Sequence, residues 1–381
     1  MNTTRKRLGH RKSRNGCARC KARHVKPGPQ SPTSSDSTVT SQGRKPMQSA
    51  DPGLPTPEGE NYTPPFGTWT QNMRLLHHYN VVICHILEDE ESTAVIWREV
   101  VPETAFSHDF LMHGLLALSS LHYAQTHPAL HDEFALISSQ YQDVALQAFA
   151  AKLQNANEGS FEPYFFLATF LFIISMCSIT GQHDPDTVIA PKDLAQSFML
   201  LQGIKSILVF KPVETCFQAG PLGPLFGHIM PLPIDHTGPF QRRLDQLFKL
   251  TRELSPTFEA MDAQSSCLLA IESLRTTYAA CAADQTTTRA RRIWLWPVSL
   301  PSFFVDLISN HHHVALIILA HYAAFTRPFE HRQWMNKGWS SKMMAAVETA
   351  LDEQWRAWVD WPKRSIVEQI DVDEMGLFEE I

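Results

Sequence analysis

Apolar residues recur every three or four positions through most of the chain, which is the period of one face of an α-helix. Residues 110–125 carry this spacing at Leu111, Leu115, Leu118 and His122. Residues 303–325 read as one further apolar run, through Phe304, Leu307, Ile308, Ala315, Ile318, Leu319 and Tyr322. The pattern therefore predicts an all-α, multi-helix body.

Prolines and turn-rich breaks separate these periodic runs. A proline at the first helical position loses no hydrogen bond, because that N–H has no partner within the helix. Such prolines stand at or just before runs at Pro128, Pro163, Pro191, Pro239, Pro256 and Pro301. Residues 180–191 and 211–239 read as connecting breaks. No alternating strand pattern and no repeat of 30–50 residues is visible, which disfavours a sandwich, a barrel or a solenoid.

Composition divides the chain into four parts. Residues 1–26 form a basic arm with ten Lys and Arg and no acidic residue, whereas the rest has 23 Lys and Arg against 39 Asp and Glu. Residues 27–68 contain 20 Pro, Ser and Gly in 42 positions, and we expect a disordered linker. Residues 69–362 are the helical body and residues 363–381 an acidic tail. This charge asymmetry is typical of a basic arm attached to an ordinary acidic domain.

One helix raises the question of a membrane. Residues 164–180 hold no charge, which is close to the lower limit of about 17 residues for a spanning helix. The segment contains Thr169, Ser175, Ser178 and Thr180 and lacks Lys or Arg flanks. We therefore expect a buried core helix and no membrane span.

The cysteines do not form the pattern of a disulfide framework. There are seven, at Cys17, Cys20, Cys84, Cys177, Cys216, Cys267 and Cys281, and five of them are scattered through apolar helical segments. The N-terminus lacks the apolar stretch of a signal peptide. These features favour a reducing compartment, the cytosol or the nucleus.

The basic arm contains the stretch RKSRNGCARCKARHVK at residues 11–26. Cys17 and Cys20 are spaced to bind one face of a tetrahedral zinc ion as thiolates. A short helix after them would carry Lys21, Arg23 and Lys26 toward DNA phosphates and base edges. We therefore take these five residues as the candidate metal-binding and DNA-binding residues.

This stretch closely resembles the first half of the fungal binuclear zinc cluster, in which six cysteines bind two zinc ions. That pattern is two cysteines separated by two residues, then six mostly basic residues and a third cysteine. Here Pro27 occupies the third cysteine's position, and the next cysteine is Cys84. Four of the six ligands are absent, so a zinc cofactor is expected only if the cluster is completed.

Three explanations of the missing ligands stay open. The gene model has lost an exon, or the protein has lost its finger, or two chains each donate Cys17 and Cys20 to one zinc ion. Without metal the arm is expected to be unfolded. Its ten positive charges would still bind DNA without sequence preference, with Kd of about 10⁻⁴–10⁻⁶ M and a strong salt dependence. A plain basic tail or nuclear localisation signal is the simpler interpretation of the same charges.

The body adds a second resemblance, to the regulatory domain of fungal sterol-uptake-control-like regulators. It rests on LLHHYNVVIC (75–84), Trp97, Val101–Pro102, HDFLMHGLLALSSLHY (108–123), ALIILAHY (315–322), Trp334, Trp339 and WRAWVDWP (355–362). The resemblance implies an all-helical domain that forms homodimers or heterodimers and works in the nucleus. It also implies a sterol-like apolar ligand or control of secondary-metabolite genes.

The ligand-binding residues themselves cannot be assigned from spacing. Aromatic and Met residues suit an irregular apolar cavity, although simple core packing is the favoured interpretation of each one. The candidates are Phe165, Phe166, Phe170, Phe172 and Met176. His311–His313 read as a partly solvated helix segment, because consecutive helical residues point apart and cannot jointly bind a metal.

The enzyme alternative finds little in the sequence. Residues 88–91 (EDEE) loosely resemble the acidic cluster of terpene-forming enzymes, but no second acidic motif accompanies them, and the run reads as a solvated helix end. There is no HExxH, GxSxG or phosphate-binding glycine motif. The sequence therefore favours a regulator over an enzyme, with a finger-less dimerising paralogue as the main alternative.

Overall fold

The computed structural model describes residues 68–88, 91–153, 161–181, 189–207, 222–229, 232–233, 237–253, 260–332 and 334–368. The chain divides into two units, Met1–Glu60 and Asn61–Ile381, and every described residue lies in the second. The basic arm, residues 27–67 of the linker and residues 369–381 of the tail lie outside the described residues.

The described residues form helices and no strand, so the prediction of an all-α body is confirmed. The α-helices are α2 (Trp69–His78), α3 (Cys84–Leu87), α4 (Glu91–Val95), α5 (Val101–Ser107), α6 (Asp109–Thr126), α7 (His131–Leu153), α8 (Phe161–Thr180), α9 (Pro191–Ile207), α11 (Pro239–Glu253), α12 (Ala260–Ala283), α13 (Leu295–Ser299), α14 (Ser302–Ser309), α15 (His313–Thr326), α16 (Trp339–Ala350) and α17 (Asp360–Val367).

Shorter segments of other helical type join them. Two are π-helical, η1 (Tyr79–Ile83) and η2 (Ile96–Val100), and each continues directly from an α-helix into the next. The 3₁₀ segments are η3 (Pro128–Leu130), η5 (Gly223–Ile229), η6 (Thr287–Trp294), η7 (Arg327–Arg332), η8 (Trp334–Asn336) and η9 (Glu353–Val359).

The first described helix begins at Trp69 because Thr68 caps it. The Thr68 hydroxyl accepts a hydrogen bond from the Gln71 backbone N–H at 3.2 Å, and the Gln71 side chain accepts one from the Thr68 N–H at 2.7 Å. This reciprocal capping box satisfies two backbone donors that no helical carbonyl can reach. The C-terminal end of the described chain, α17, extends beyond Pro362 to Val367.

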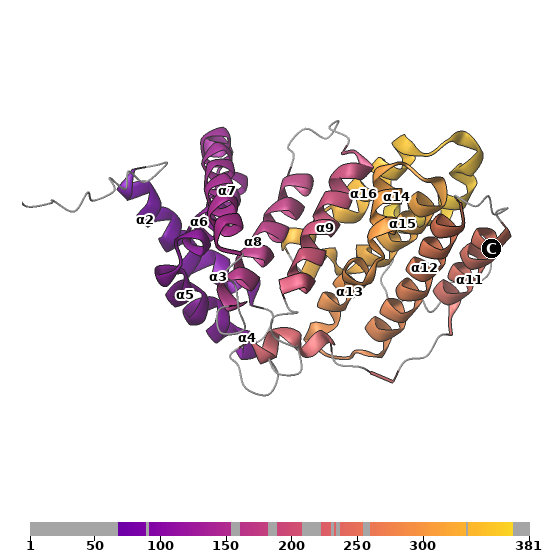
Figure 1. The fold of residues 1–381 in the computed structure, drawn as a ribbon, viewed down its shortest axis with the longest axis horizontal. Coiled ribbons are helices and arrows are strands. Elements are labelled where there is room, and N and C mark those ends of the chain that lie inside the picture. The colour runs from indigo at the N-terminus through magenta and orange to yellow at the C-terminus, as the bar shows by residue number, and fades with distance from the viewer. Residues whose placement is uncertain are drawn as a thin grey trace, which may run out of the picture. The chain divides into compact units, whose positions relative to one another are not determined.

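The helices pack in an order that places α8 in the middle of this unit. Helix α6 packs against α7 and α8, α8 packs against α9, and α9 packs against α14 (Figure 1). Helices α15 and α16 pair with each other, as do α11 and α12. Because neighbours cover α8 on several sides, nearly all of its residues are apolar.

Helix α8 is also long and apolar enough to cross a membrane, and 72% of its most apolar window is buried by the rest of the structure. The pair α14 and α15 passes the same test of length and composition only when taken together across a bend of 100°. Residues 164–180 therefore form a core helix of the described body, as expected from the sequence.

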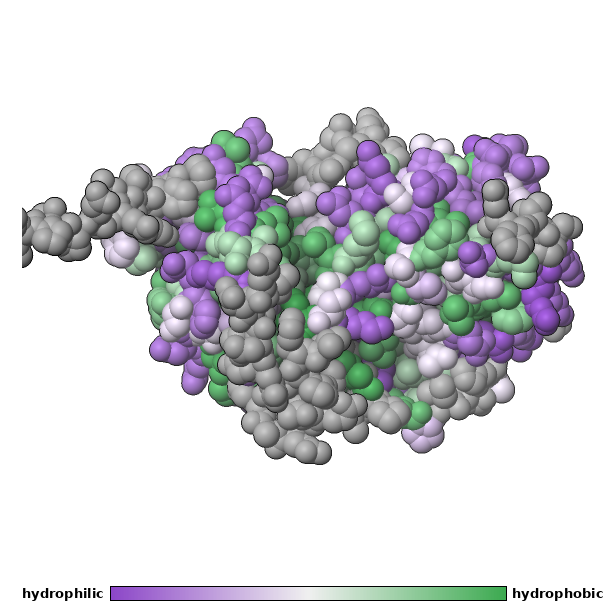
Figure 2. Space-filling view, viewed as in Figure 1, coloured by the Kyte–Doolittle hydropathy of each residue, from purple (hydrophilic) through white to green (hydrophobic). Residues whose placement is uncertain are grey.

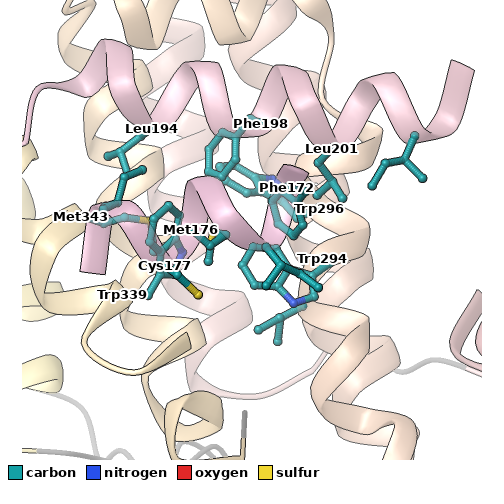
Figure 3. Packing of buried hydrophobic residues seen from close by; sticks show 14 of the residues in the cluster. Phe172, Met176, Cys177, Leu194, Phe198, Leu201, Trp294, Trp296, Trp339 and Met343 are labelled. Carbon is teal, nitrogen blue, oxygen red and sulfur yellow. The ribbon is translucent and has the colours of Figure 1, made fainter. Parts of the chain in front are cut away.

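Large aromatic side chains fill the core around α8 and α9. The Trp296 ring stacks on Tyr322 with centroids 4.2 Å apart, and its indole N–H donates to the Ala270 carbonyl at 2.8 Å. Phe198 of α9 meets the Trp296 ring edge-on at 6.2 Å (Figure 3). Each such burial contributes roughly 1.5–3 kcal/mol of hydrophobic stabilisation, and the Trp296 N–H is satisfied at the same time.

The prediction of one apolar run over residues 303–325 was wrong, because a turn divides it into α14 and α15. His311 has a left-handed backbone with φ of 59°, and His312 caps α15 by accepting a hydrogen bond from the Ala315 N–H at 3.5 Å. His313 lies 3.1 Å from Asp352 and stacks on Trp355. These histidines therefore form a turn and a helix start rather than a solvated helix segment.

The remaining histidine and acidic motifs have structural partners. His85 Nδ1 lies 3.0 Å from Glu88 Oε1, and Arg98 donates to the same carboxylate oxygen. Glu88 is the C-cap of α3 and Glu91 begins α4, whereas Asp89 and Glu90 lie outside the described residues. Among the described residues, no group of three or more His, Cys, Asp or Glu side chains is placed to bind a metal ion.

Candidate ligand pocket

A cavity of about 500 Å³ lies beside α8. This volume is within the range of roughly 300–1,000 Å³ that is typical of small-molecule sites. Its lining is almost wholly apolar and comes from elements along the whole described body: Ile86, Leu87, Trp97, Phe165, Thr169, Phe172, Ile173, Leu201, Ile204, Lys205, Leu225, Phe226, Ile229, Arg291, Trp294, Leu295, Val298, Trp334 and Met335. Apolar residues also gather around α8 and α9 on the face drawn in Figure 2.

The two π-helical segments shape the first wall of this cavity. Trp97 lies in η2, and Ile86 and Leu87 lie in α3 directly after η1. The Tyr79 hydroxyl of η1 donates to the Trp97 carbonyl at 2.9 Å, which joins the two segments. A π turn adds one residue to a helical turn and so changes the direction of the residues that follow, and such turns are frequent at functional sites.

The opposite wall is built from η6, α13 and α9. The Tyr322 hydroxyl donates to the Ile293 carbonyl of η6 at 3.2 Å. The Gln202 side-chain amide of α9 donates to Pro297 and Leu300 carbonyls at 3.2 and 3.1 Å. These bonds fix the main chain of α13 against α9, so the side chains of both elements converge on one space.

A buried ion pair joins η6 to the residue that follows α12. Arg292 Nε donates to Asp284 Oδ2 at 2.5 Å, and the side chains are 4% and 2% exposed. Asp284 also accepts hydrogen bonds from the Thr286 backbone and hydroxyl at 2.8 and 2.6 Å. Because Arg292 stands beside Arg291 and near Trp294, this pair holds the segment that supplies two cavity residues.

Aromatic pairs form the interior surface. Phe172 of α8 meets Trp294 of η6 edge-on with centroids 5.1 Å apart, and Figure 3 shows the two rings side by side. Phe165 packs against Phe226 of η5 at 5.4 Å. Edge-on and tilted contacts of this kind add to the area term of burial.

Two of the five candidate pocket residues on α8 line the cavity, and three do not. Phe165 and Phe172 line it, whereas Phe166, Phe170 and Met176 are buried in the core outside the lining set. The residues that sequence reasoning missed include Trp97, Trp294 and the η5 pair Leu225 and Phe226. The η5 pair lies within residues 211–239, which the sequence indicated as a connecting break.

The few polar groups at the cavity are hydrogen-bond donors or cations. Lys205 and Arg291 line it, and none of the described residues that line it is Asp or Glu. The Thr169 hydroxyl already donates to the Phe165 carbonyl at 2.9 Å. The indole N–H groups of Trp97 and Trp294 are buried and make no hydrogen bond within the described part of the chain.

A neutral histidine pair stands behind one wall. His78 Nε2 and His122 Nδ1 are 2.9 Å apart, and the His122 ring meets the cavity residue Trp334 at 4.7 Å. Burial, followed by the nearby charge of His78, lowers the pKa of His122 to about 4. Burial also lowers the pKa of His78. Both rings are therefore neutral at pH 7, and one imidazole donates to the other.

The described cysteines are buried and unreactive. Cys84, Cys177, Cys267 and Cys281 are all free thiols. Burial raises the pKa of Cys267 to about 12 and raises the pKa of Cys177 further. Because the thiolate is the reactive form, burial makes these thiols poor nucleophiles at neutral pH.

The candidate zinc and DNA residues Cys17, Cys20, Lys21, Arg23 and Lys26 lie outside the described residues. Their donor set can be compared with a binuclear cluster on composition alone. Two of six required thiolates are present in the arm, and a structural zinc site needs four ligands. The residues of one arm therefore do not fit a binuclear zinc cluster.

Part of the body matches a known family of domains. Residues 74–207 match the fungal specific transcription factor domain. The Zn(2)-C6 fungal-type transcription factor afumD of Aspergillus fumigatus is 23% identical over 336 residues, which are 83% of this chain and 86% of that protein. The chain is thus similar to fungal zinc-cluster transcription factors along most of its length.

Two further relatives align over smaller shares of their own length. Sterol uptake control protein 2 of Saccharomyces cerevisiae is 32% identical over 111 residues, 29% of this chain and 12% of that protein. A Zn(2)-C6 fungal-type transcription factor of Gibberella zeae is 25% identical over 329 residues, 77% of this chain and 61% of that protein. Relatives named as transcription factors favour a regulator rather than an enzyme.

The matched domain and the cavity coincide in part. The segments of α3, η2, α8 and α9 that line the cavity all lie within residues 74–207, and the other walls come from the chain after it. A fragment limited to the matched domain would therefore leave the cavity open on the side of η6 and α13.

Proposed function

We propose that this protein is a nuclear regulator of transcription by RNA polymerase II whose helical body binds an apolar small molecule. The observation that carries the proposal is the cavity of about 500 Å³ within a body that matches the fungal specific transcription factor domain. Protein interiors are packed as densely as organic crystals and rarely contain a void of this size, so the cavity needs an explanation such as a ligand.

A ligand in the cavity would affect the body by contacting the segments that line the cavity. The lining residues come from α3, η2, α8, α9, η5, η6, α13 and η8, so one ligand contacts segments far apart in sequence. A ligand that binds one arrangement of these segments better than another shifts the population toward it. The shifted surface would then change dimerisation or partner binding, which sets transcriptional output.

The basic arm is proposed as the DNA contact. Lys21, Arg23 and Lys26 would contact phosphates and base edges, and Cys17 and Cys20 would be zinc thiolates only in a completed cluster. Pro27 at the third ligand position favours a second candidate function, a finger-less paralogue that dimerises with an intact relative and reduces that relative's activity.

We propose two classes of target genes, one from the name of a relative and one from the sequence resemblance. The name Sterol uptake control protein 2 supports sterol genes as one target class. Secondary-metabolite genes are the other class that the sequence resemblance implies. A homodimer or a heterodimer with a related regulator would be the working assembly.

A cavity-filling substitution tests ligand control. Leu295→Trp replaces an aliphatic side chain at the cavity with a bulky indole ring. Leu269→Trp is the control, because it makes the same change on α12, where Leu269 is 60% exposed. Transcripts should change when the gene is deleted, and Leu295→Trp should hold the same genes in one state under all growth conditions. Wild-type behaviour of Leu295→Trp, at normal protein level, would contradict ligand control.

The arm needs its own experiment. The transcript across the codons for Lys26 and Pro27 is sequenced first, and the protein that it encodes is purified and assayed for zinc and for DNA binding. An mRNA encoding further cysteines predicts zinc-dependent, sequence-specific binding. An mRNA that reads as this chain predicts weak, salt-sensitive binding, and no DNA binding at low salt would refute any role of the arm on DNA.

A further inference from the structure

Two neighbouring arginines, one on α11 and one on α17, have no carboxylate partner in the described part of the chain. Arg243 of α11 lies over the Trp361 ring of α17, 4.4 Å from its centroid, and Arg364 follows Trp361 by three residues on α17. Burial, followed by the nearby charge of Arg364, lowers the pKa of Arg243, so the two guanidinium groups are close enough to repel each other. Neither forms an ion pair with a described residue.

Other cations of the same region do have counter-charges. Lys363 pairs with Glu348, and Arg327 pairs with Glu330 and donates to the Ile366 carbonyl at 3.4 Å. The unbalanced positive charge is therefore confined to the two arginines, and an anionic partner for it has a defined position.

An exposed apolar side chain lies beside these charges. Val367, the last residue of α17, is 72% exposed and stands three residues after Arg364, and residues three apart share a helix face. Arg243, Arg364 and Val367 thus form one surface, the α17 patch. A segment with both carboxylates and apolar side chains would neutralise the charges and cover the valine.

The chain continues after α17 into a segment of this composition. Residues 369–381 contain no Lys or Arg and five acidic residues, Asp371, Asp373, Glu374, Glu379 and Glu380. Apolar residues are interleaved with them, at Ile370, Val372, Met375, Leu377, Phe378 and Ile381. Interleaved acidic and apolar residues are typical of the activation segments through which transcription factors bind other proteins.

The tether to α17 is short enough for this segment to reach the patch. Glu368 caps α17 by donating its N–H to the Arg364 carbonyl at 2.9 Å, about 6 Å along the helix from Arg364. Asp371 and Asp373 follow Glu368 by three and five residues, which extend to roughly 10 and 17 Å. A short tether gives such a contact an effective concentration on the order of millimolar, so weak charge pairs are sufficient.

We propose that residues 369–381 bind back on the α17 patch of their own chain, with carboxylates against Arg243 and Arg364 and apolar side chains against Val367. Docking withholds an acidic, apolar segment from other proteins, and release presents it to a partner with an apolar groove and basic rim. The docking requires neither the ligand pocket nor DNA binding by the arm, so its failure leaves the proposed function standing.

Cleavage of the folded full chain by a glutamate-specific protease tests the docking. Mass spectrometry follows release of the fragment that begins at Met375, after Glu374. The segment has to leave the patch before it is cleaved, so the rate reports the undocked fraction. In low salt, the wild-type chain should be cleaved at least about threefold more slowly than the Arg243→Gln, Arg364→Gln double variant. Salt at about 0.5 M should remove the difference.

Matched variants locate the effect, and circular dichroism checks that each is folded. Arg364→Gln alone changes only an exposed side chain and should give part of the increase, whereas Lys192→Gln makes a similar charge change at the exposed start of α9 and should give none. Arg364→Glu should speed cleavage further, and adding Asp371→Lys should restore protection because the two charges are exchanged. Each low-salt rate is divided by the same variant's high-salt rate, which removes effects of the substitution on the protease.

Three results would overturn the inference. The first is equal cleavage of the wild-type chain and the double arginine variant in low salt. The second is no recovery of protection when Asp371→Lys is added to Arg364→Glu. The third is protection that rises with protein concentration, since the segment would then dock on a second copy rather than on its own chain.

Discussion

The buried ion pair behind η6 gives the sharpest prediction about stability. Asp284 and Arg292 are almost fully buried, and Asp284 accepts three hydrogen bonds, from Arg292 and Thr286. Asp284→Ala removes this carboxylate from beside a buried guanidinium. Removing one partner of a buried pair costs about 3–5 kcal/mol, because the remaining charge loses that attraction at a site with little access to water. We expect a loss of that size in the free energy of unfolding.

An exposed pair in the same protein provides the control. Arg356 and Glu353 lie 2.7 Å apart, with side chains 55% and 82% exposed. Glu353→Ala should cost less than about 1 kcal/mol, since water and salt already screen this pair. Both free energies are measured by urea unfolding followed by circular dichroism at 222 nm. A loss below about 1 kcal/mol for Asp284→Ala, or equal losses for the two variants, would refute the reasoning.

A double variant separates the effect of losing the ion pair from the effect of the buried charge that remains in Asp284→Ala. Replacing Asp284 with Leu and Arg292 with Met removes both charges and keeps apolar volume in their place. Such replacements are often neutral or stabilising relative to a buried pair. The double variant should therefore be more stable than Asp284→Ala. If it is less stable, the hydrogen bonds to Thr286 carry the structure rather than the balance of charge.

Three further predictions use other parts of the body. Gly114→Leu should destabilise the protein by about 1–3 kcal/mol, because even a Cβ there would collide with Leu167 of α8. Gly203→Ala is the control, since a Cβ there meets open space, and it should stabilise α9 by up to about 1 kcal/mol. Equal unfolding midpoints for the two variants would contradict this. Burial lowers the pKa of His321 to about 4, so the unfolded chain binds a proton below about pH 6.5 while the native ring stays neutral. Stability should fall from about pH 6.5 to pH 4, by up to about 3 kcal/mol from this group, and unfolding at several pH values should show a shallower fall for His321→Phe. The four described cysteines should react with a maleimide at pH 7 only on unfolding, and rapid labelling of the native protein would show that α8 and α12 open readily.

Hydrophobic periodicity predicted the existence of the helices better than their breaks. Helix α6 lies where apolar residues recur at helical spacing and α8 lies where the sequence is apolar and uncharged throughout, so both helices leave a direct trace in the sequence. The break between α14 and α15 leaves none, since apolar residues continue on both sides of it. It depends on a left-handed backbone at His311, and although histidine adopts that conformation more often than most residues, it does so too seldom for the sequence to mark a turn there.

The cavity was only partly predictable for a related reason. Helix α8 is apolar around its whole circumference, so its period cannot say which aromatic residues contact a void and which contact other helices. That choice depends on where η5 and η6 lie, and the sequence of α8 carries no information about the position of either segment. Lys205 and Arg291 give no signal either, because each resembles an ordinary surface cation until the fold places both at one cavity.

The composition of the cavity walls also suggests how a ligand signal would spread. Four of the wall elements, η2, η5, η6 and η8, are π or 3₁₀ segments, whose hydrogen-bond geometry is less favourable than that of an α-helix. Such segments open at lower free energy than core α-helices, so they have the most stability to gain from a bound ligand. A ligand at about 100 times its Kd adds about 2.7 kcal/mol to the stability of the state that binds it. That amount is enough to order weak walls and too small to reorganise α8, so the regulated surface should be the one that η5, η6 and η8 form.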